Sequence, residues 1–150
     1  MKDIKFTKQL KKDIFEYYAC FPISIINAHK YYGQKCLSLK KLIKMCKCLY
    51  GGVIIDDEKE CIKKMNRVYF KFTKNIDKVL RHNGIITIMH PKYNLHSAFC
   101  FYNAVKEKYC LVNSLLDSKV VKEMTEEQIK TLLPKHKTNN NHWYVTGVKS

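Results

Sequence analysis

The residue with the clearest chemical potential is Cys20, which directly precedes an apolar run over 21–28. Pro22 suits the first turn of a helix and Gly33 supplies a C-terminal stop, so the pattern predicts a helix over 21–32. A thiol at a helix start meets unpaired backbone N–H groups and the positive end of the helix dipole, and both favour the thiolate. Cys20 is therefore a candidate nucleophile.

A cysteine nucleophile needs a base within hydrogen-bond reach and a further group that orients this base. His96 opens an alternating, strand-like segment, and Asn113 ends the next such segment. If residues 104–107 form the loop between them, residue 98 pairs with residue 113, and His96 and Asn113 become diagonal neighbours on one face. An odd loop would point them to opposite faces. The spacing permits a triad of Cys20, His96 and Asn113 but does not require it.

Helical spacing extends through the first half of the chain. We predict a helix capped by Ser38 that ends at Gly51-Gly52, and a short helix that follows Asp56-Asp57-Glu58 and includes Cys61, Ile62 and Met65. A further helix is predicted after Thr73, closed by Asn83-Gly84. Residues 1–16 form a lysine-rich segment before these helices.

The second half has the period of strands. We predict strands over 85–89, 96–102, 109–113 and 143–145, and a helix that a capping box at Thr125 opens and that runs through Leu133. Helices followed by an antiparallel sheet define an α+β class. We expect a single domain over 1–150, with a cleft between its two layers.

Composition indicates a folded, basic protein. The chain carries a net charge of +15, but only two of its 28 basic residues are arginines, Arg67 and Arg81. Base readout depends on arginine, so the charge permits nucleic-acid binding without making it specific. No signal-peptide pattern or membrane-spanning run is present, and seven cysteines make an odd number. We expect a cytoplasmic protein with reduced thiols, and no membrane span.

Two metal hypotheses find little support. Cys46 and Cys48 lie two positions apart and would point in different directions on a helix, with no matching pair at zinc-finger spacing. The carboxylates over 56–58 lack the alternate spacing and the glycine of a calcium loop. We expect no metal and no cofactor.

The region around the helix start resembles the nucleophile helix of papain-like cysteine peptidases related to the bacteriocin-leader-processing, or double-glycine, group. The residues that carry this resemblance are Cys20-Phe21-Pro22-Ile23-Ser24, Asn27-Ala28 and Tyr31-Tyr32-Gly33. The order of later features fits the same group: an apolar strand after Gly84, His96, Asn113, a helix and finally Trp143. The resemblance implies a papain-like fold in which N-terminal helices pack on a C-terminal sheet.

The resemblance also implies roles for the site residues. Cys20 would be the nucleophile, His96 the general base and later the acid, and Asn113 the residue that holds the imidazole. The group commonly has Asp followed by Pro at the third position. Here Asn113-Ser114 is nearer to the papain arrangement, and Asp117 is the alternative orienting residue.

The sequence departs from the group at the oxyanion hole. Such peptidases usually place a glutamine about six residues before the nucleophile, where it donates a hydrogen bond to the oxyanion. Ile14 occupies that position here, and Gln9 is the nearest upstream glutamine. Either Gln9 reaches the site by a longer path, or the hole is built from the Cys20 N–H and another group.

Two functions follow from these observations. The first is a small papain-like cysteine peptidase that hydrolyses a peptide, isopeptide or other amide bond in a protein or peptide substrate. The second is a catalytically degraded papain-like fold that acts as a basic protein- or nucleic-acid-binding module, for example one encoded by a virus. The sequence leaves the substrate and the oligomeric state open.

Overall fold

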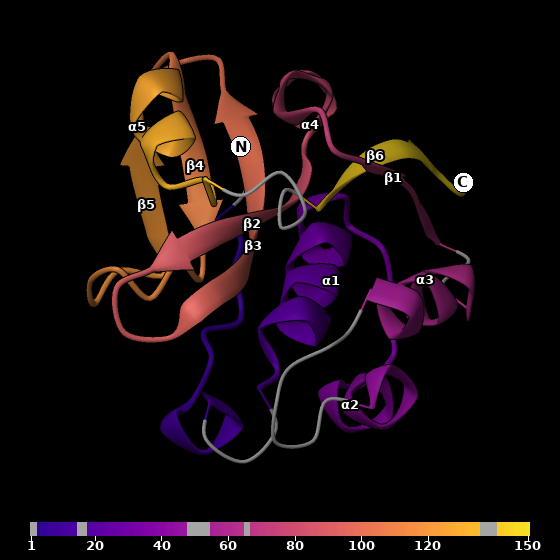
Figure 1. Cartoon of the computed structure of the whole chain (residues 1–150). Helices are drawn as coiled ribbons and strands as arrows, with labels where there is room; N and C mark the ends of the chain where they lie inside the picture. Colours follow the sequence, from indigo (N-terminus) through magenta and orange to yellow (C-terminus); the bar gives the residue numbers. More distant parts are fainter. Residues whose placement is uncertain (1–2, 15–17, 48–54, 65–66, 136–140) are drawn as a thin grey trace.

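The computed structural model describes residues 3–14, 18–47, 55–64, 67–135 and 141–150, and these form helices on both faces of one sheet (Figure 1). The helices of the described residues are α1 (Cys20–Tyr31), α2 (Leu39–Cys46), α3 (Ile55–Lys64), α4 (Ile76–His82) and α5 (Glu126–Thr131). The strands are β1 (Val68–Thr73), β2 (Gly84–His90), β3 (Asn94–Asn103), β4 (Lys108–Val112), β5 (Val121–Met124) and β6 (His142–Val148). They pair antiparallel in the order β1-β6-β2-β3-β4-β5.

The alternation of side chains along β3 divides the core in two. Phe99 and Phe101 belong to a cluster with residues of α1, α2 and α3, whereas Ala98 and Cys100 belong to a second cluster with residues of α4 and α5. Figure 1 shows α1 between the sheet and the pair α2 and α3, with α4 and α5 in the other half of the molecule. The α+β class is confirmed.

Helix α1 begins and ends within one residue of the predicted limits, 21 and 32. Cys20 is its first residue, and Pro22 lies in its first turn, where a missing N–H costs no helical hydrogen bond. Gly33 follows the helix with φ +66° and donates its N–H to the Lys30 carbonyl at 3.1 Å. The helix therefore fixes Cys20 at its N-terminal end.

The next two helices differ from their predicted limits. Ser38 caps α2 as expected, accepting a hydrogen bond from the Lys41 N–H, but the helix ends at Cys46 because Lys47 adopts the left-handed conformation. The predicted end at Gly51-Gly52 lies outside the described residues, as does Met65. Helix α3 includes the carboxylates over 56–58 in its first turn, where they complement the helix dipole.

The prediction of an entirely helical first half is wrong at β1. Its side chains alternate between buried and exposed at the start, and the strand pairs with β6 near the other end of the chain. Thr73 therefore ends a strand instead of capping a helix, and Asn75 caps α4 by accepting a hydrogen bond from the Asp77 N–H. Strand β5 was not predicted either.

The hairpin between β3 and β4 has the even loop on which the proposed triad depends. Asn103 pairs with Lys108 and Phe99 pairs with Val112, so the loop is 104–107. The capping box at Thr125 is confirmed, although α5 ends at Thr131, two residues before the predicted end. Within the described residues, no helix combines the length and apolar character needed to cross a membrane.

Gly84 should be essential for the join between β2 and β6. A Cβ at this position would overlap the main-chain carbonyl of Trp143 on the paired strand. We expect Gly84→Ala to reduce the free energy of unfolding by at least about 2–3 kcal/mol, because backbone cannot move aside as a flexible side chain can. Urea unfolding followed by the fluorescence of the single tryptophan would measure the loss.

Gly33→Ala is the matched control. A Cβ there meets nothing within 4 Å, so its cost comes only from the positive φ and should be about 1 kcal/mol. Equal losses from the two substitutions would contradict the close approach of β2 and β6.

Candidate functional site

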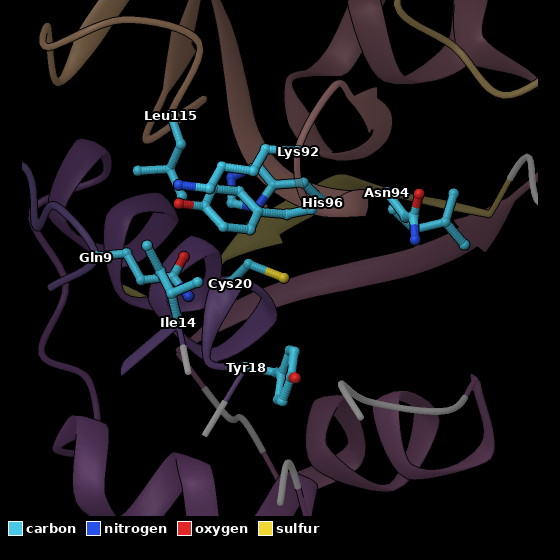
Figure 2. A pocket seen from close by; sticks show the side chains of 10 residues that line it. Gln9, Ile14, Tyr18, Cys20, Lys92, Asn94, His96 and Leu115 are labelled. Atoms are coloured by element: carbon cyan, nitrogen blue, oxygen red, sulfur yellow. The ribbon is translucent and has the colours of Figure 1, made fainter. Parts of the chain in front are cut away.

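A pocket of about 540 Å³ lies where the N-terminal segment, the start of α1 and the β2–β3 hairpin meet. Figure 2 shows Gln9, Ile14 and Cys20 close together, with His96, Lys92 and Leu115 above them in this view. All six residues line the pocket, as do Tyr18 and Tyr93. The pocket thus brings together three of the residues that the sequence singled out, Cys20, His96 and Gln9.

Cys20 is partly exposed, and its thiol interacts with the backbone and side chain of Ser97 and with the backbone of Phe21. Burial of the thiol raises its pKa above the ordinary value, and this effect outweighs the hydrogen bonds from Ser97 and Phe21, which lower the pKa. The negative charge of Glu58 raises the pKa further. In this arrangement burial therefore outweighs the backbone N–H of the helix start, which favours the thiolate as expected.

His96 is buried in β3, and its Nε2 lies 2.6 Å from the main-chain carbonyl oxygen of Asn113. A carbonyl oxygen only accepts hydrogen bonds, so Nε2 must carry a proton and donate it. In the neutral ring, Nδ1 is then the basic nitrogen. Burial lowers the pKa of His96 despite the bond to Asn113, so the neutral ring is favoured.

The thiol and the imidazole share the pocket without a hydrogen bond to each other among the described residues. The thiol interacts with Ser97 and the imidazole with Asn113. His96 and Ser97 are consecutive residues of β3, and Cys20 and His96 both line the pocket. The structure has the thiol on the Ser97 side.

Asn113 meets His96, but not in the predicted way. It was expected to hold the imidazole with its side chain, whereas its main-chain carbonyl makes that contact. The residue has φ +60°, so the chain turns sharply at the end of β4. Its side chain instead bonds Gln9: Oδ1 accepts from the Gln9 N–H at 2.8 Å, and Nδ2 donates to Gln9 Oε1 at 3.3 Å.

Gln9 reaches the pocket because the extended N-terminal segment is tied to α1. The Asn27 amide bonds both the N–H and the carbonyl of Thr7, at 2.7 and 3.0 Å, and the Lys30 ammonium bonds the Thr7 hydroxyl. These contacts hold the segment beside the start of α1, and Gln9 is buried there. Ile14, which occupies the position expected for glutamine, lines the same pocket.

Asp117 does not meet His96. Its exposed carboxylate accepts hydrogen bonds from the Lys119 N–H at 2.9 Å and from the Lys122 ammonium at 2.7 Å. The Lys122 and Lys119 contacts lower the pKa of Asp117. The structure therefore gives no orienting contact between this alternative residue and the imidazole.

Sequence reasoning missed two residues that act on the thiol, Ser97 and Glu58. The Glu58 carboxylate in α3 accepts a hydrogen bond from Trp143 Nε1 at 2.9 Å, and burial raises its pKa to about 7 despite that bond. Its place among three consecutive carboxylates suggests only a helix start. Ser97 could have been found from its position next to His96.

Metal ligation is not indicated by the described residues. Among them, no group of three or more histidine, cysteine or acidic side chains is arranged to hold a metal ion. Cys46 is buried and contacts Cys61 of α3, and that hydrogen bond lowers the pKa of Cys61. Cys48 lies outside the described residues.

No model of a known protein family matches the sequence, and no curated protein matches it. Among solved structures, the chain is similar to the crystal structure of the peptidase domain of Streptococcus ComA, a bifunctional ABC transporter involved in a quorum-sensing pathway. The TM-score is 0.70 at 16% sequence identity, and the match covers 95% of this chain and 98% of that chain. The chain therefore has a papain-like peptidase fold, as the resemblance in its sequence predicts.

Proposed function

We propose that the protein is a cysteine peptidase in which Cys20 is the nucleophile and His96 the general base and acid. The observation that carries this proposal is the pocket in which the thiol at the start of α1 and the imidazole of β3 lie together. The papain-like fold supports it, because the similar structure is a peptidase domain. The substrate would be a protein or peptide.

The first half of the reaction forms an acyl-enzyme. The Cys20 thiol gives its proton to Nδ1 of His96, and the sulfur attacks the carbonyl carbon of an amide. The C–N bond then breaks, and the imidazolium returns the proton to the leaving amine. Water hydrolyses the thioester to a carboxylic acid and regenerates the thiol. The same steps would cleave peptide, isopeptide and side-chain amide bonds.

Proton transfer requires the thiol to leave Ser97 and turn toward His96. The movement is a rotation about the Cα–Cβ bond of Cys20. Catalytic hydrogen bonds are often formed only in the substrate complex, so this bond need not be present in the free protein. An imidazolium beside the sulfur then favours the thiolate and opposes the effect of burial. The high thiol pKa of the free protein is thus compatible with catalysis.

Selective alkylation tests the proposal. Iodoacetamide at about pH 6 should modify Cys20 faster than the other cysteines, because the fraction of molecules in which the thiol has turned toward His96 holds it as a thiolate beside an imidazolium. His96→Ala removes that pair and should slow the reaction by roughly tenfold or more. Mass spectrometry of the digested protein gives the rate at each cysteine. Cleavage of a random decapeptide library should be lost in Cys20→Ala.

Cys36 is the internal control. It is partly exposed like Cys20, but burial raises its pKa to about 12 and it has no part in the pocket. Alkylation of Cys20 at the slow rate of Cys36, unchanged by His96→Ala, would rule out the peptidase.

A second candidate function is binding of an acidic partner by a noncatalytic form of the fold. A groove of about 550 Å³ beside α2 favours it, because Lys12, Lys40, Lys44 and Lys47 line it together with Leu39 and Ile43. If this face binds nucleic acid, affinity for a fluorescent oligonucleotide should fall steeply with salt and weaken in the quadruple Lys→Gln variant. Absence of salt-dependent binding would exclude this form of the second function.

Glu58 and Ser97 should tune the reactivity of Cys20 in opposite directions. Above about pH 7, where the Glu58 carboxyl is ionised, its charge holds the pKa of Cys20 up. Glu58→Gln keeps the acceptor for Trp143 and removes the charge, so alkylation of Cys20 at pH 8 should accelerate, by roughly 2- to 10-fold. Below the pKa of Glu58 the two proteins should react alike.

Ser97→Ala is the opposing control. It removes a hydrogen bond that lowers the pKa of Cys20, so alkylation of the free protein at pH 8 should slow. Equal effects of the two substitutions would show that neither acts through the charge state of the thiol.

A further inference from the structure

The bond pattern around Asn113 fixes which atom of each amide lies where. The backbone N–H of Gln9 can only donate, so the Asn113 atom that it contacts must be Oδ1. The other side-chain atom of Asn113 is then Nδ2, which donates and requires an acceptor. The Gln9 atom that faces it is therefore Oε1.

This orientation leaves the Gln9 side-chain nitrogen, Nε2, outside the contact with Asn113. Among the described residues, none accepts a hydrogen bond from Nε2. Gln9 lines the pocket beside Cys20, and Figure 2 shows its side chain extending toward Cys20. An amide N–H held there is a donor for an oxyanion that forms at the attacked carbonyl.

The main chain of Asn113 has a separate role. Its carbonyl oxygen, not its side chain, accepts the proton of His96 Nε2. The imidazole is thus oriented by a group that every residue possesses, and the side chain is available for Gln9. One buried residue serves two different parts of the site.

We propose that the Asn113 side chain is a positioning residue for Gln9 as the oxyanion donor, and that the Asn113 main-chain carbonyl orients His96. This assignment rests on the function proposed above. It explains how a glutamine eleven residues before the nucleophile can supply the oxyanion donor that Ile14 cannot supply. Two hydrogen bonds from Asn113 fix Gln9 in position, so the number of residues between the glutamine and the nucleophile is free to change.

Two probes of Cys20 separate the two tasks. Iodoacetamide reacts with the thiolate by displacement of iodide, so its rate depends on the His96 pair but forms no oxyanion. p-Nitrophenyl acetate transfers its acetyl group to the sulfur through a tetrahedral oxyanion and releases p-nitrophenolate, so its rate depends on both. Mass spectrometry of the Cys20 peptide measures each rate in the folded 150-residue chain.

Asn113→Gly is the informative variant, because glycine accepts the positive φ and keeps the carbonyl that holds His96. Acetylation of Cys20 should fall by about tenfold or more, as in Gln9→Ala, while the rate and pH profile of alkylation stay within about twofold. The double variant should be no slower than Gln9→Ala alone, because both substitutions remove the same donor.

Asn113→Asp is a second variant for the same two rate measurements if the glycine variant fails to fold. A carboxylate has no proton to donate, so the Gln9 amide should turn its Nε2 toward the carboxylate and away from the pocket. The ratio of the acetylation rate to the alkylation rate should again fall, because the new charge acts on both rates through the thiol whereas loss of the donor acts on acetylation alone. Asp117→Asn, at an exposed residue outside the pocket, should change neither rate.

Two results would overturn the assignment. One is a loss of alkylation in Asn113→Gly as large as that in His96→Ala, since the side chain would then orient the imidazole. The other is unchanged acetylation in both Asn113 variants. If Cys20 of the unaltered protein is not selectively alkylated, the peptidase proposal fails instead, so the two failures are distinguishable.

Discussion

The site depends on the buried left-handed residue Asn113, whose four polar groups all have partners. Its N–H donates to the Val120 carbonyl at 2.7 Å, its carbonyl accepts from His96, and its side chain bonds both the backbone and the side chain of Gln9. Three segments far apart in sequence are joined at this one point. Since leaving a buried polar group without a partner costs about 1–3 kcal/mol, each of these contacts constrains the others.

The parts of the fold that the sequence predicts well are those with local signals. The helix start at Cys20 and the capping box at Thr125 each depend on residues only a few positions apart. The sequence also predicts the hairpin of β3 and β4, but it leaves open whether the loop is even or odd, which only the pairing of the strands decides. Strand β1 was not predicted because it is stabilised by pairing with β6, whose residues lie 69 to 80 positions later in the chain. Local propensity carries no information about a partner at that distance.

Only those contacts of the site that follow from the spacing of residues along paired strands could be predicted. The pairing of β3 with β4 correctly brings Asn113 to His96, but the positive φ of Asn113 decides that the carbonyl makes the contact. No pattern in the sequence marks that dihedral angle, since asparagine adopts both signs of φ. Likewise, Gln9 reaches the pocket through the bonds between Thr7 and Asn27, which are twenty residues apart.

The thiol shows why a helix start alone does not make a nucleophile. The helix dipole contributes about 0.3–1 kcal/mol, less than one pKa unit, whereas burial can shift a pKa by several units. In the free protein burial prevails, and the neutral thiol bonds Ser97. In the proposed mechanism a charged imidazole of His96 supplies the positive charge that favours the thiolate, so ionisation of Cys20 accompanies its turn toward His96.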